Sequence, residues 1–377
     1  MLGIKSFITA LGVVIIVCGA CQKSLLPVPP GEGSGGGGGD DTVIPVKTLP
    51  ASSLHPFGRT ITDEHQSLDL VGSASQVGFS FEGTTANVYV SVPTWLEHNW
   101  LQYELDGVYQ KRVRVLASSK APLVITASTR GKHTVWIYKT TEAQTGPVII
   151  DSVSGGNIAA IERPQAPLIE FIGNSISSGA MSDPSDVPCG QGAYYDQHNA
   201  YMAYGPRVAR AVGANYMVNS VSGIGIYRNA NGGAPMPQVY EKTELQGTSM
   251  WDFKLYSPKI VCIELGTNDI SKDRASFDST LFVKDYVQFI QLVKSKYGNV
   301  QIALLSSPIL NASDDQLLQN CLTAIKKQVD ASSPSDKPVA LYFFKPAPMH
   351  GCSYHPSVDD HGSIATELTP FFKDLLK

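Results

Sequence analysis

The chain has 377 residues, of which 43% are hydrophobic and 16% charged, enough for about two globular domains with sizeable cores. Its formal net charge of -4 gives no basic excess of the kind that marks nucleic-acid binders. We therefore expect no nucleic-acid partner.

The first 21 residues are typical of an export signal. Lys5 supplies a positive charge, and residues 7–17 are apolar but too short for a bilayer span of about 20 residues. A Gly-Ala pair then precedes Cys21, which resembles the lipobox of bacterial lipoproteins, where the cysteine is acylated and becomes the mature N-terminus. Cys18 stands where that pattern usually has leucine, so an ordinary secretory signal is the alternative. We expect a protein of the bacterial cell envelope, in the outer membrane or periplasm, anchored to the membrane through a lipid on Cys21.

Residues 22–44 are rich in proline and glycine and predict a flexible linker. Residues 45–163 predict a smaller all-β domain, because short stretches of alternating hydrophobicity recur between turn residues such as Asp106-Gly107 and Arg130-Gly131. We expect strands at 86–92, 100–105, 111–116, 123–127 and 133–139. This spacing is typical of a sandwich or jelly roll.

Pro164 and Pro167 mark the start of a second domain, residues 164–377. Apolar runs predict strands at 168–172, 216–221, 260–265, 301–306 and 339–344. Amphipathic patterns predict helices at 200–212, 278–296, 314–329 and 363–376. Buried strands that alternate with such helices predict an α/β fold with a five-stranded parallel sheet between two helical layers. Ligands of these sheets bind beyond the carboxyl ends of the strands.

Four cysteines remain after the export signal. Cys262 falls in an expected strand and Cys321 in an expected helix, so we expect both to pack as small apolar residues. Cys189 and Cys352 lie in expected loops of an exported protein, where they could form a disulfide, but their spacing does not fix the pairing. The spacing of the four fits no zinc motif.

Ser175, Gly223, Asn268 and His355 each follow an expected strand. Taken singly, each has a plainer interpretation: the serine as a helix cap, Gly223 and Asn268 as turn residues, and the histidine before Pro356 as structural. Together at one edge of a parallel sheet, they supply a nucleophile, oxyanion donors and a base for attack on an ester.

This order resembles the SGNH hydrolase superfamily, a branch of the GDSL esterases, over residues 164–377. The resemblance implies a flavodoxin-like fold with Ser175 as nucleophile and His355 as general base. It also implies an oxyanion hole made of the Ser175 and Gly223 amides and the Asn268 side chain. The serine mechanism that it implies requires no metal or organic cofactor.

Five short strings in the β-domain are similar to those of carbohydrate esterase family 2, at residues 58–59, 81–84, 105–107, 131–135 and 139–143. This resemblance implies O-deacetylation of an acetylated polysaccharide or oligosaccharide of the xylan or glucomannan type. Separately, we expect a monomer. The alternatives are an esterase or lipase for another acyl ester, an enzyme for acetylated cell-wall glycan, and a catalytically weakened carbohydrate-binding surface lipoprotein.

The chain departs from the superfamily pattern at two positions. Asn174 replaces the aspartate before the nucleophile, a residue that supports the loop. Cys352 stands three residues before His355, where many of these enzymes carry the acid of the triad. Family 2 esterases include Ser-His dyads, so we expect a dyad of Ser175 and His355 with a loop carbonyl that orients the imidazole.

Other polar and aromatic residues near these motifs have plainer expected roles. We expect Asp359 and Asp360 to cap the last helix and Asp269 to fix its own loop. Trp251, Tyr194 and Tyr227 are candidates to line the substrate cleft, since aromatic rings stack on sugars, although core packing is the commoner role of a large ring.

Overall fold

The computed structural model describes residues 44–345 and 347–377. The expected export signal with Cys21, and all of the expected linker except its last residue, lie outside the described residues. Within the described part of the chain, no helix is both long and apolar enough to cross a membrane.

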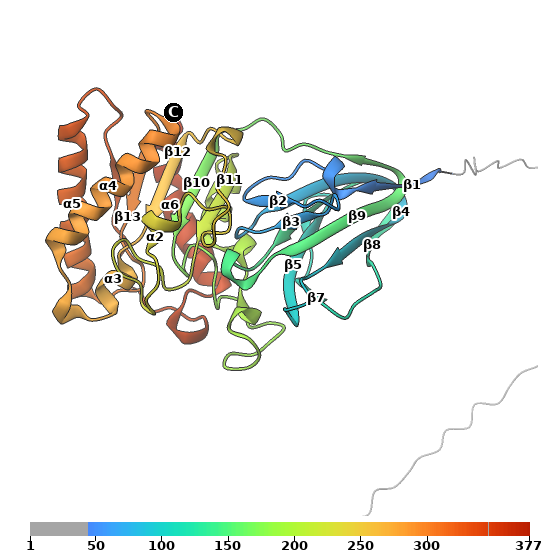
Figure 1. Ribbon diagram of the computed structural model, residues 1–377, viewed down its shortest axis with the longest axis horizontal. Coiled ribbons are helices and arrows are strands. Elements are labelled where there is room, and N and C mark those ends of the chain that lie inside the picture. Colours follow the sequence, from blue (N-terminus) through green and yellow to red (C-terminus); the bar gives the residue numbers. More distant parts are fainter. Residues whose placement is uncertain (1–43, 346) are drawn as a thin grey trace, which may run out of the picture. The chain divides into compact units, whose positions relative to one another are not determined.

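An antiparallel sheet makes up the expected β-domain, residues 45–163 (Figure 1). Its strands are β1 (Val46–Pro50), β2 (Thr60–Thr62), β3 (Leu68–Leu70), β4 (Gln76–Ser91), β5 (His98–Leu105), β6 (Val108–Tyr109), β7 (Val113–Leu116), β8 (Leu123–Lys139) and β9 (Val148–Ala160). The main path runs β2-β3-β9-β4-β8-β5-β6, with β1 beside β9 and β7 beside β5. Alternate residues such as Val77, Phe79 and Phe81 of β4 are fully buried and build an apolar core.

The Arg130-Gly131 turn that the sequence predicts does not exist. The two expected strands on either side of it form one strand of 17 residues, β8. The register between β4 and β8 instead shifts between Gly83 and Thr85, where Gly83 faces Gly131. Paired glycines at this point mark a bulge within a long strand rather than a chain reversal.

The second sheet is parallel and five-stranded, as predicted. Its strands are β10 (Leu168–Gly173), β11 (Asn215–Ser220), β12 (Ile260–Glu264), β13 (Gln301–Leu305) and β14 (Ala340–Tyr342), in the order β11-β10-β12-β13-β14. The chain leaves β10 towards β11 on one side and later returns to β12 on the other. This reversal places a binding crevice at the carboxyl ends of β10 and β12.

Helices cover both faces of this sheet (Figure 1). The helix α4 (Ser279–Tyr297) and the helix α5 (Ala312–Ser332) pack on one face; α1 (Tyr204–Ala211) and α6 (Val358–Leu375) pack on the other. Two shorter helices, α2 (Met236–Val239) and α3 (Thr267–Ser271), follow β11 and β12. Side chains of Asp278, Asn311 and Ser357 accept hydrogen bonds from the first backbone amides of α4, α5 and α6, which fixes where these helices begin.

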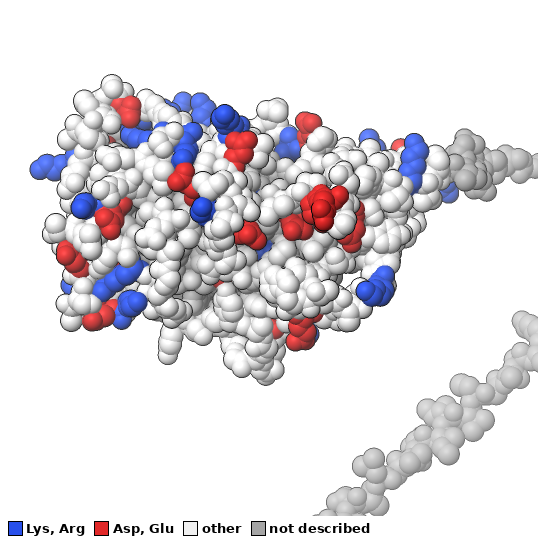
Figure 2. Space-filling model, viewed as in Figure 1, with Lys and Arg blue, Asp and Glu red and all other residues white. Residues whose placement is uncertain are grey.

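Polar and backbone bonds join the two regions. The guanidinium of Arg59, which is 1% exposed, donates to the Asn219 side chain on β11 and to the backbone oxygens of Tyr240 and Lys242. Ser73 forms a backbone bridge with Val218 of the same strand. On the face drawn in Figure 2, acidic and basic side chains are interspersed on a mostly uncharged surface. That face shows no extended basic area for a nucleic acid.

Candidate active site

Three strand ends bring the site together. Gly173 of β10 lies beside Ser220 of β11 on one side and beside Glu264 of β12 on the other. Ser175, Gly223 and Asn268 come only a few residues after these positions, so the parallel register delivers them to the same edge of the sheet.

Ser175 and His355 are in hydrogen-bond contact. The Oγ of Ser175 lies 2.9 Å from Nε2 of His355, and Nδ1 of His355 lies 3.0 Å from the backbone oxygen of Ser353. A carbonyl oxygen can only accept, so Nδ1 must carry the proton and Nε2 must accept the proton of the serine hydroxyl. Burial lowers the pKa of His355 below its ordinary value of 6.5, which keeps the imidazole neutral and basic at neutral pH.

The loop before His355 is held in an unusual backbone shape. Ser353 and Tyr354 have φ values of 50° and 62°, the left-handed region that L-residues rarely adopt. A disulfide joins Cys352 to Cys189, and the Cys352 amide donates to the backbone oxygen of Met181 at 2.9 Å. The sequence left the pairing of these two cysteines open, and the structure joins them. Cys352, which stands where many related enzymes carry the triad acid, thus anchors the loop that carries His355.

Gly223 and Asn268 face the same cavity as the serine. Gly223 has φ of 78°, a conformation that glycine adopts without strain. The Asn268 amide donates one hydrogen to the Ile224 oxygen at 2.8 Å, which orients the group and leaves its second hydrogen for a ligand. Asp269 accepts from the amides of Ile226 and Tyr227, so it fixes the loop after β11, as the sequence predicts for a loop-holding carboxylate.

The Asn174 side chain stabilises the turn that carries the nucleophile. Its side-chain oxygen accepts from the Ile176 amide at 2.8 Å, which closes the turn that carries Ser175. An aspartate is not needed for that bond, because the amide oxygen makes it equally. The departure from the superfamily pattern at this position therefore leaves the turn intact.

The cavity around these groups has a volume of about 430 Å³. Its lining combines Gln144, which follows β8, with residues that follow β10 and β11 and with Asn268 and His355. The full lining is Gln144, Ser175, Ala180, Met181, Tyr194, Ser222, Gly223, Asn231, Asn268 and His355. The sequence predicted Tyr194 and the four core residues here. It missed Gln144, which comes from the β-region and reaches the cavity through the fold alone.

Two of the expected cleft aromatics lie elsewhere. Trp251 is 7% exposed and packs with Leu168, the first residue of β10, at the opposite edge of the sheet from Ser175. Tyr227 packs against Phe277 and Phe282. Neither Tyr227 nor Trp251 lines the cavity. Both predictions are wrong, because core packing takes these rings, the commoner role that the sequence left open.

The other acids and histidines have structural partners. Asp360 accepts from the Ser357 amide at the start of α6 and from Nδ1 of His350, so it caps the helix as expected. His361 is buried, and its Nδ1 accepts from the Tyr204 amide at 3.2 Å. Cys262 and Cys321 are buried free thiols, as predicted.

Tyr354, which immediately precedes His355, is 88% exposed. A ring so exposed beside the base is free to contact a bound ligand through its apolar face. Its position beside the expected base is the one signal in the sequence that points to it.

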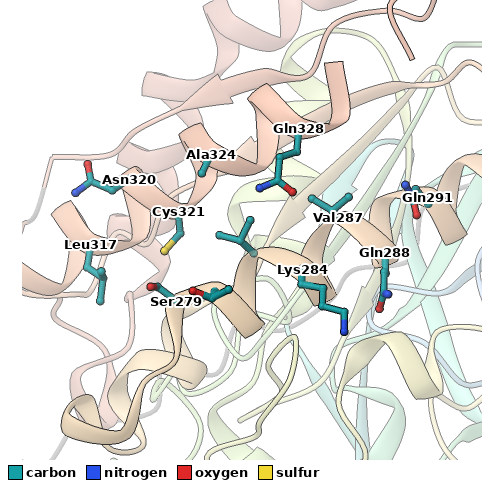
Figure 3. Close-up of a pocket in the computed structure, with 12 residues that line it drawn as sticks. Ser279, Lys284, Val287, Gln288, Gln291, Leu317, Asn320, Cys321, Ala324 and Gln328 are labelled. Atoms are coloured by element: carbon teal, nitrogen blue, oxygen red, sulfur yellow. The ribbon is translucent and has the colours of Figure 1, made fainter. Parts of the chain in front are cut away.

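A larger hollow of about 680 Å³ lies between α4 and α5 (Figure 3). Its walls are apolar residues and uncharged amides and hydroxyls, with Lys284 as the one charged lining residue among those described. No histidine or carboxylate stands among the lining residues to activate the hydroxyls of Ser279 and Thr280. The Cys321 thiol is buried, and its pKa is raised to about 11. The chemistry therefore belongs to the smaller cavity at Ser175.

Comparisons with known proteins agree with this geometry. The family model described as "Carbohydrate esterase 2 N-terminal" matches residues 57–161. The chain is 30% identical over 319 residues to the cellulase/esterase CelE of Acetivibrio thermocellus, a match that covers 81% of this chain and 37% of that protein. It is 29% identical over 290 residues to an acetylxylan esterase / glucomannan deacetylase of Cellvibrio japonicus, covering 69% of this chain and 77% of the relative. The chain thus spans little more than a third of CelE but most of the second relative.

A solved structure of similar fold is the family two carbohydrate esterase from Clostridium thermocellum in complex with cellohexaose. The TM-score is 0.76 with 28% sequence identity, over 88% of this chain and 99% of that one. The similarity therefore covers both the antiparallel and the parallel sheet.

Proposed function

From its antiparallel sheet to its last helix this chain resembles the family 2 carbohydrate esterases of the SGNH superfamily, and we propose that it is a carbohydrate O-acetylesterase. The observation that carries the proposal is the contact of Ser175 Oγ with Nε2 of a His355 whose other nitrogen is bound to a carbonyl. That arrangement prepares a serine for attack on an ester carbonyl.

The reaction proceeds through an acetyl-enzyme. His355 takes the Ser175 proton as Oγ attacks the acetyl carbonyl, and the resulting oxyanion is bound by the Ser175 and Gly223 amides and the Asn268 side chain. Each such donor stabilises the transition state by about 2.7–4 kcal/mol. His355 then protonates the sugar oxygen, which leaves. Water, deprotonated by the same imidazole, attacks the acetyl group and releases acetate.

The imidazole has no carboxylate partner among the described residues, so the dyad depends on the Ser353 carbonyl. A neutral acceptor holds the tautomer but stabilises the imidazolium less than an aspartate does. The oxyanion donors therefore supply the larger part of the rate enhancement.

The substrate we propose is an acetylated polysaccharide of the xylan or glucomannan type. Support comes from a relative named as an acetylxylan esterase / glucomannan deacetylase and from a structural neighbour solved with cellohexaose. The exposed Tyr354 ring beside His355 offers a platform on which the apolar face of a sugar can stack. The cavity of about 430 Å³ is small, which suits an acetyl group and one neighbouring sugar better than a long acyl chain.

We further propose that the protein acts as a monomer at the bacterial envelope, tethered through a lipid on Cys21. The Gly-Ala-Cys pattern after an apolar stretch supports the tether. Cys21→Ser should move the protein from the membrane fraction to the soluble fraction in a bacterial host that acylates lipoproteins. Equal partition of the two forms would contradict the tether.

Acetate release tests the function. The protein and Ser175→Ala are incubated with acetylated xylan, acetylated glucomannan and acetylated peptidoglycan, and with aryl acetate and aryl octanoate. We expect the wild type to release acetate from a plant-type polysaccharide and to prefer aryl acetate. A preference for octanoate would favour a lipase, release from peptidoglycan alone would favour a wall-glycan enzyme, and binding without release would favour a carbohydrate-binding protein.

A further inference from the structure

A buried carboxylate from the β-region contacts the oxyanion side of the cavity. Glu142 follows β8, directly before the short helical turn Ala143–Thr145, and its side chain is fully buried. One carboxylate oxygen accepts from the backbone amide of Ser222 at 2.6 Å. The other accepts from the hydroxyl of Tyr194, which lines the cavity.

Ser222 immediately precedes Gly223, the glycine whose amide the proposed mechanism assigns to the oxyanion hole. The direction of that amide depends on the backbone angles of Ser222 and Gly223, so fixing the Ser222 amide fixes the start of the turn. On the far side of the same turn, Asp269 accepts from the amides of Ile226 and Tyr227. Two buried carboxyl groups therefore hold this loop, one near each end, by accepting hydrogen bonds from its backbone amides.

The segment that carries Glu142 is itself fixed. The ammonium of Lys139, fully buried, donates to the backbone oxygens of Thr141 and Glu142 at 3.0 and 2.6 Å. The same segment contributes Gln144 to the cavity wall. Burying a lysine is costly unless its hydrogen bonds are made, and here they hold one short stretch of backbone in place.

We propose that Glu142 is a positioning residue for the esterase reaction, which holds the Ser222-Gly223 turn so that the Gly223 amide meets the oxyanion. The antiparallel region is then a working part of the active site rather than a separate module. This inference rests on the proposed function, since an oxyanion forms only if the site cleaves an ester.

The competing explanation is that Glu142 only stabilises the fold. A structural role would lower the melting temperature of Glu142 variants without changing the turnover of the folded protein. A positioning role would lower kcat and kcat/KM together, with KM little changed, because the Gly223 amide acts mainly in the transition state.

The test compares Glu142→Gln and Glu142→Ala with the wild type on aryl acetate. Removing one oxyanion donor outright costs about 10²–10³ in kcat. We expect Glu142→Ala, which leaves the donor in place but free to turn, to lose about tenfold to a hundredfold in kcat. Glu142→Gln keeps an acceptor for the Ser222 amide and should lose less, by up to about tenfold. If the alanine variant does not fold, the glutamine variant carries the test alone.

A matched control is Glu104→Gln. Glu104 of β5 is also buried and accepts bonds from the hydroxyls of Tyr138 and Tyr201, but it touches no cavity residue. This variant should lower the melting temperature and leave kcat within about twofold of the wild type, since nothing near the reacting atoms moves.

A second readout isolates the oxyanion. Methylboronic acid adds to a serine oxygen as a tetrahedral anion, so its inhibition constant reports how well the oxyanion hole is formed. We expect it to rise in the Glu142 variants in parallel with the loss of kcat and to stay unchanged in Glu104→Gln. Unchanged kcat and boronate affinity in folded Glu142→Gln and Glu142→Ala, or a loss confined to KM, would overturn the proposal. A wild type as inactive as Ser175→Ala would instead overturn the proposed function itself.

Discussion

The orientation of His355 depends on one strained residue, so substitution at Ser353 tests the dyad. Ser353 accepts the Nδ1 proton of His355 from a backbone with φ of 50°. This region costs an L-residue such as serine about 1–2 kcal/mol relative to glycine, and it costs a β-branched residue such as valine more. Ser353→Val should therefore favour a loop shape in which the carbonyl no longer meets the imidazole.

The size of the effect follows from that penalty. Serine already bears the L-residue cost, so only the extra cost of valine counts; at about 1 kcal/mol it shifts the equilibrium away from the correct loop by about fivefold, because 1.4 kcal/mol is tenfold in an equilibrium. We expect kcat of Ser353→Val on aryl acetate to fall by this factor, and kcat of Ser353→Gly to stay within about threefold of the wild type. The ceiling is the roughly 10⁴-fold loss seen when the orienting group of a serine protease is removed.

Steady-state kinetics of the two variants, on protein shown to be folded by circular dichroism, decide the point. Equal kcat in the valine and glycine variants would refute the reasoning, since the carbonyl would then not matter. A loss in both would show that the serine side chain, and not the backbone shape, is what the site needs.

Three further predictions follow from the site. Replacing both Cys189 and Cys352 by serine removes a cross-link between residues 163 positions apart, which stabilises the fold by about 5 kcal/mol at most through the entropy of the unfolded chain. The melting temperature should therefore fall by several degrees, and kcat should fall because the His355 loop becomes less fixed. An unchanged melting curve would contradict this. Because burial lowers the pKa of His355 and only the neutral imidazole accepts the serine proton, kcat/KM should fall on the acid side with a midpoint below pH 6.5, and a midpoint above that value would contradict the buried dyad. Burial raises the pKa of Glu264 from 4.5 to about 8, so the stability that its neutral form contributes is full below pH 4.5 and is lost as the pH rises through 8. Glu264→Gln should therefore resist urea better than the wild type above pH 8, by up to roughly 5 kcal/mol, and an equal urea midpoint there would show that the carboxyl is not buried neutral.

Hydrophobic periodicity located the parallel sheet from the sequence. Each of the five expected strands lies within two residues of the observed one at either end, because fully buried strands are unbroken apolar runs. The same reasoning placed Ser175, Gly223 and Asn268 at one edge, since parallel strands share an edge. Periodicity failed at Gly131, where a bulge inside β8 has the composition of a turn.

Long-range contacts could not be predicted. Glu142 and Ser222 are 80 positions apart, in loops that follow strands of different sheets, and no local pattern connects a carboxylate to a backbone amide at that distance. The Cys189 and Cys352 pair had the same limit, because two loop cysteines are compatible with pairing or with separation until the fold brings them together. Trp251 shows the converse: a large aromatic in a loop can fill a core as readily as a cleft.

The central claim, that Ser175 carries the acetyl group through the reaction, is tested most directly by trapping the intermediate. The protein is mixed with an excess of aryl acetate, quenched in acid within the first turnover and digested for mass spectrometry. The account predicts a peptide heavier by one acetyl group, with the added mass on Ser175, in the wild type and not in Ser175→Ala. An acetylated residue other than Ser175, or acetate release by Ser175→Ala at the wild-type rate, would contradict it.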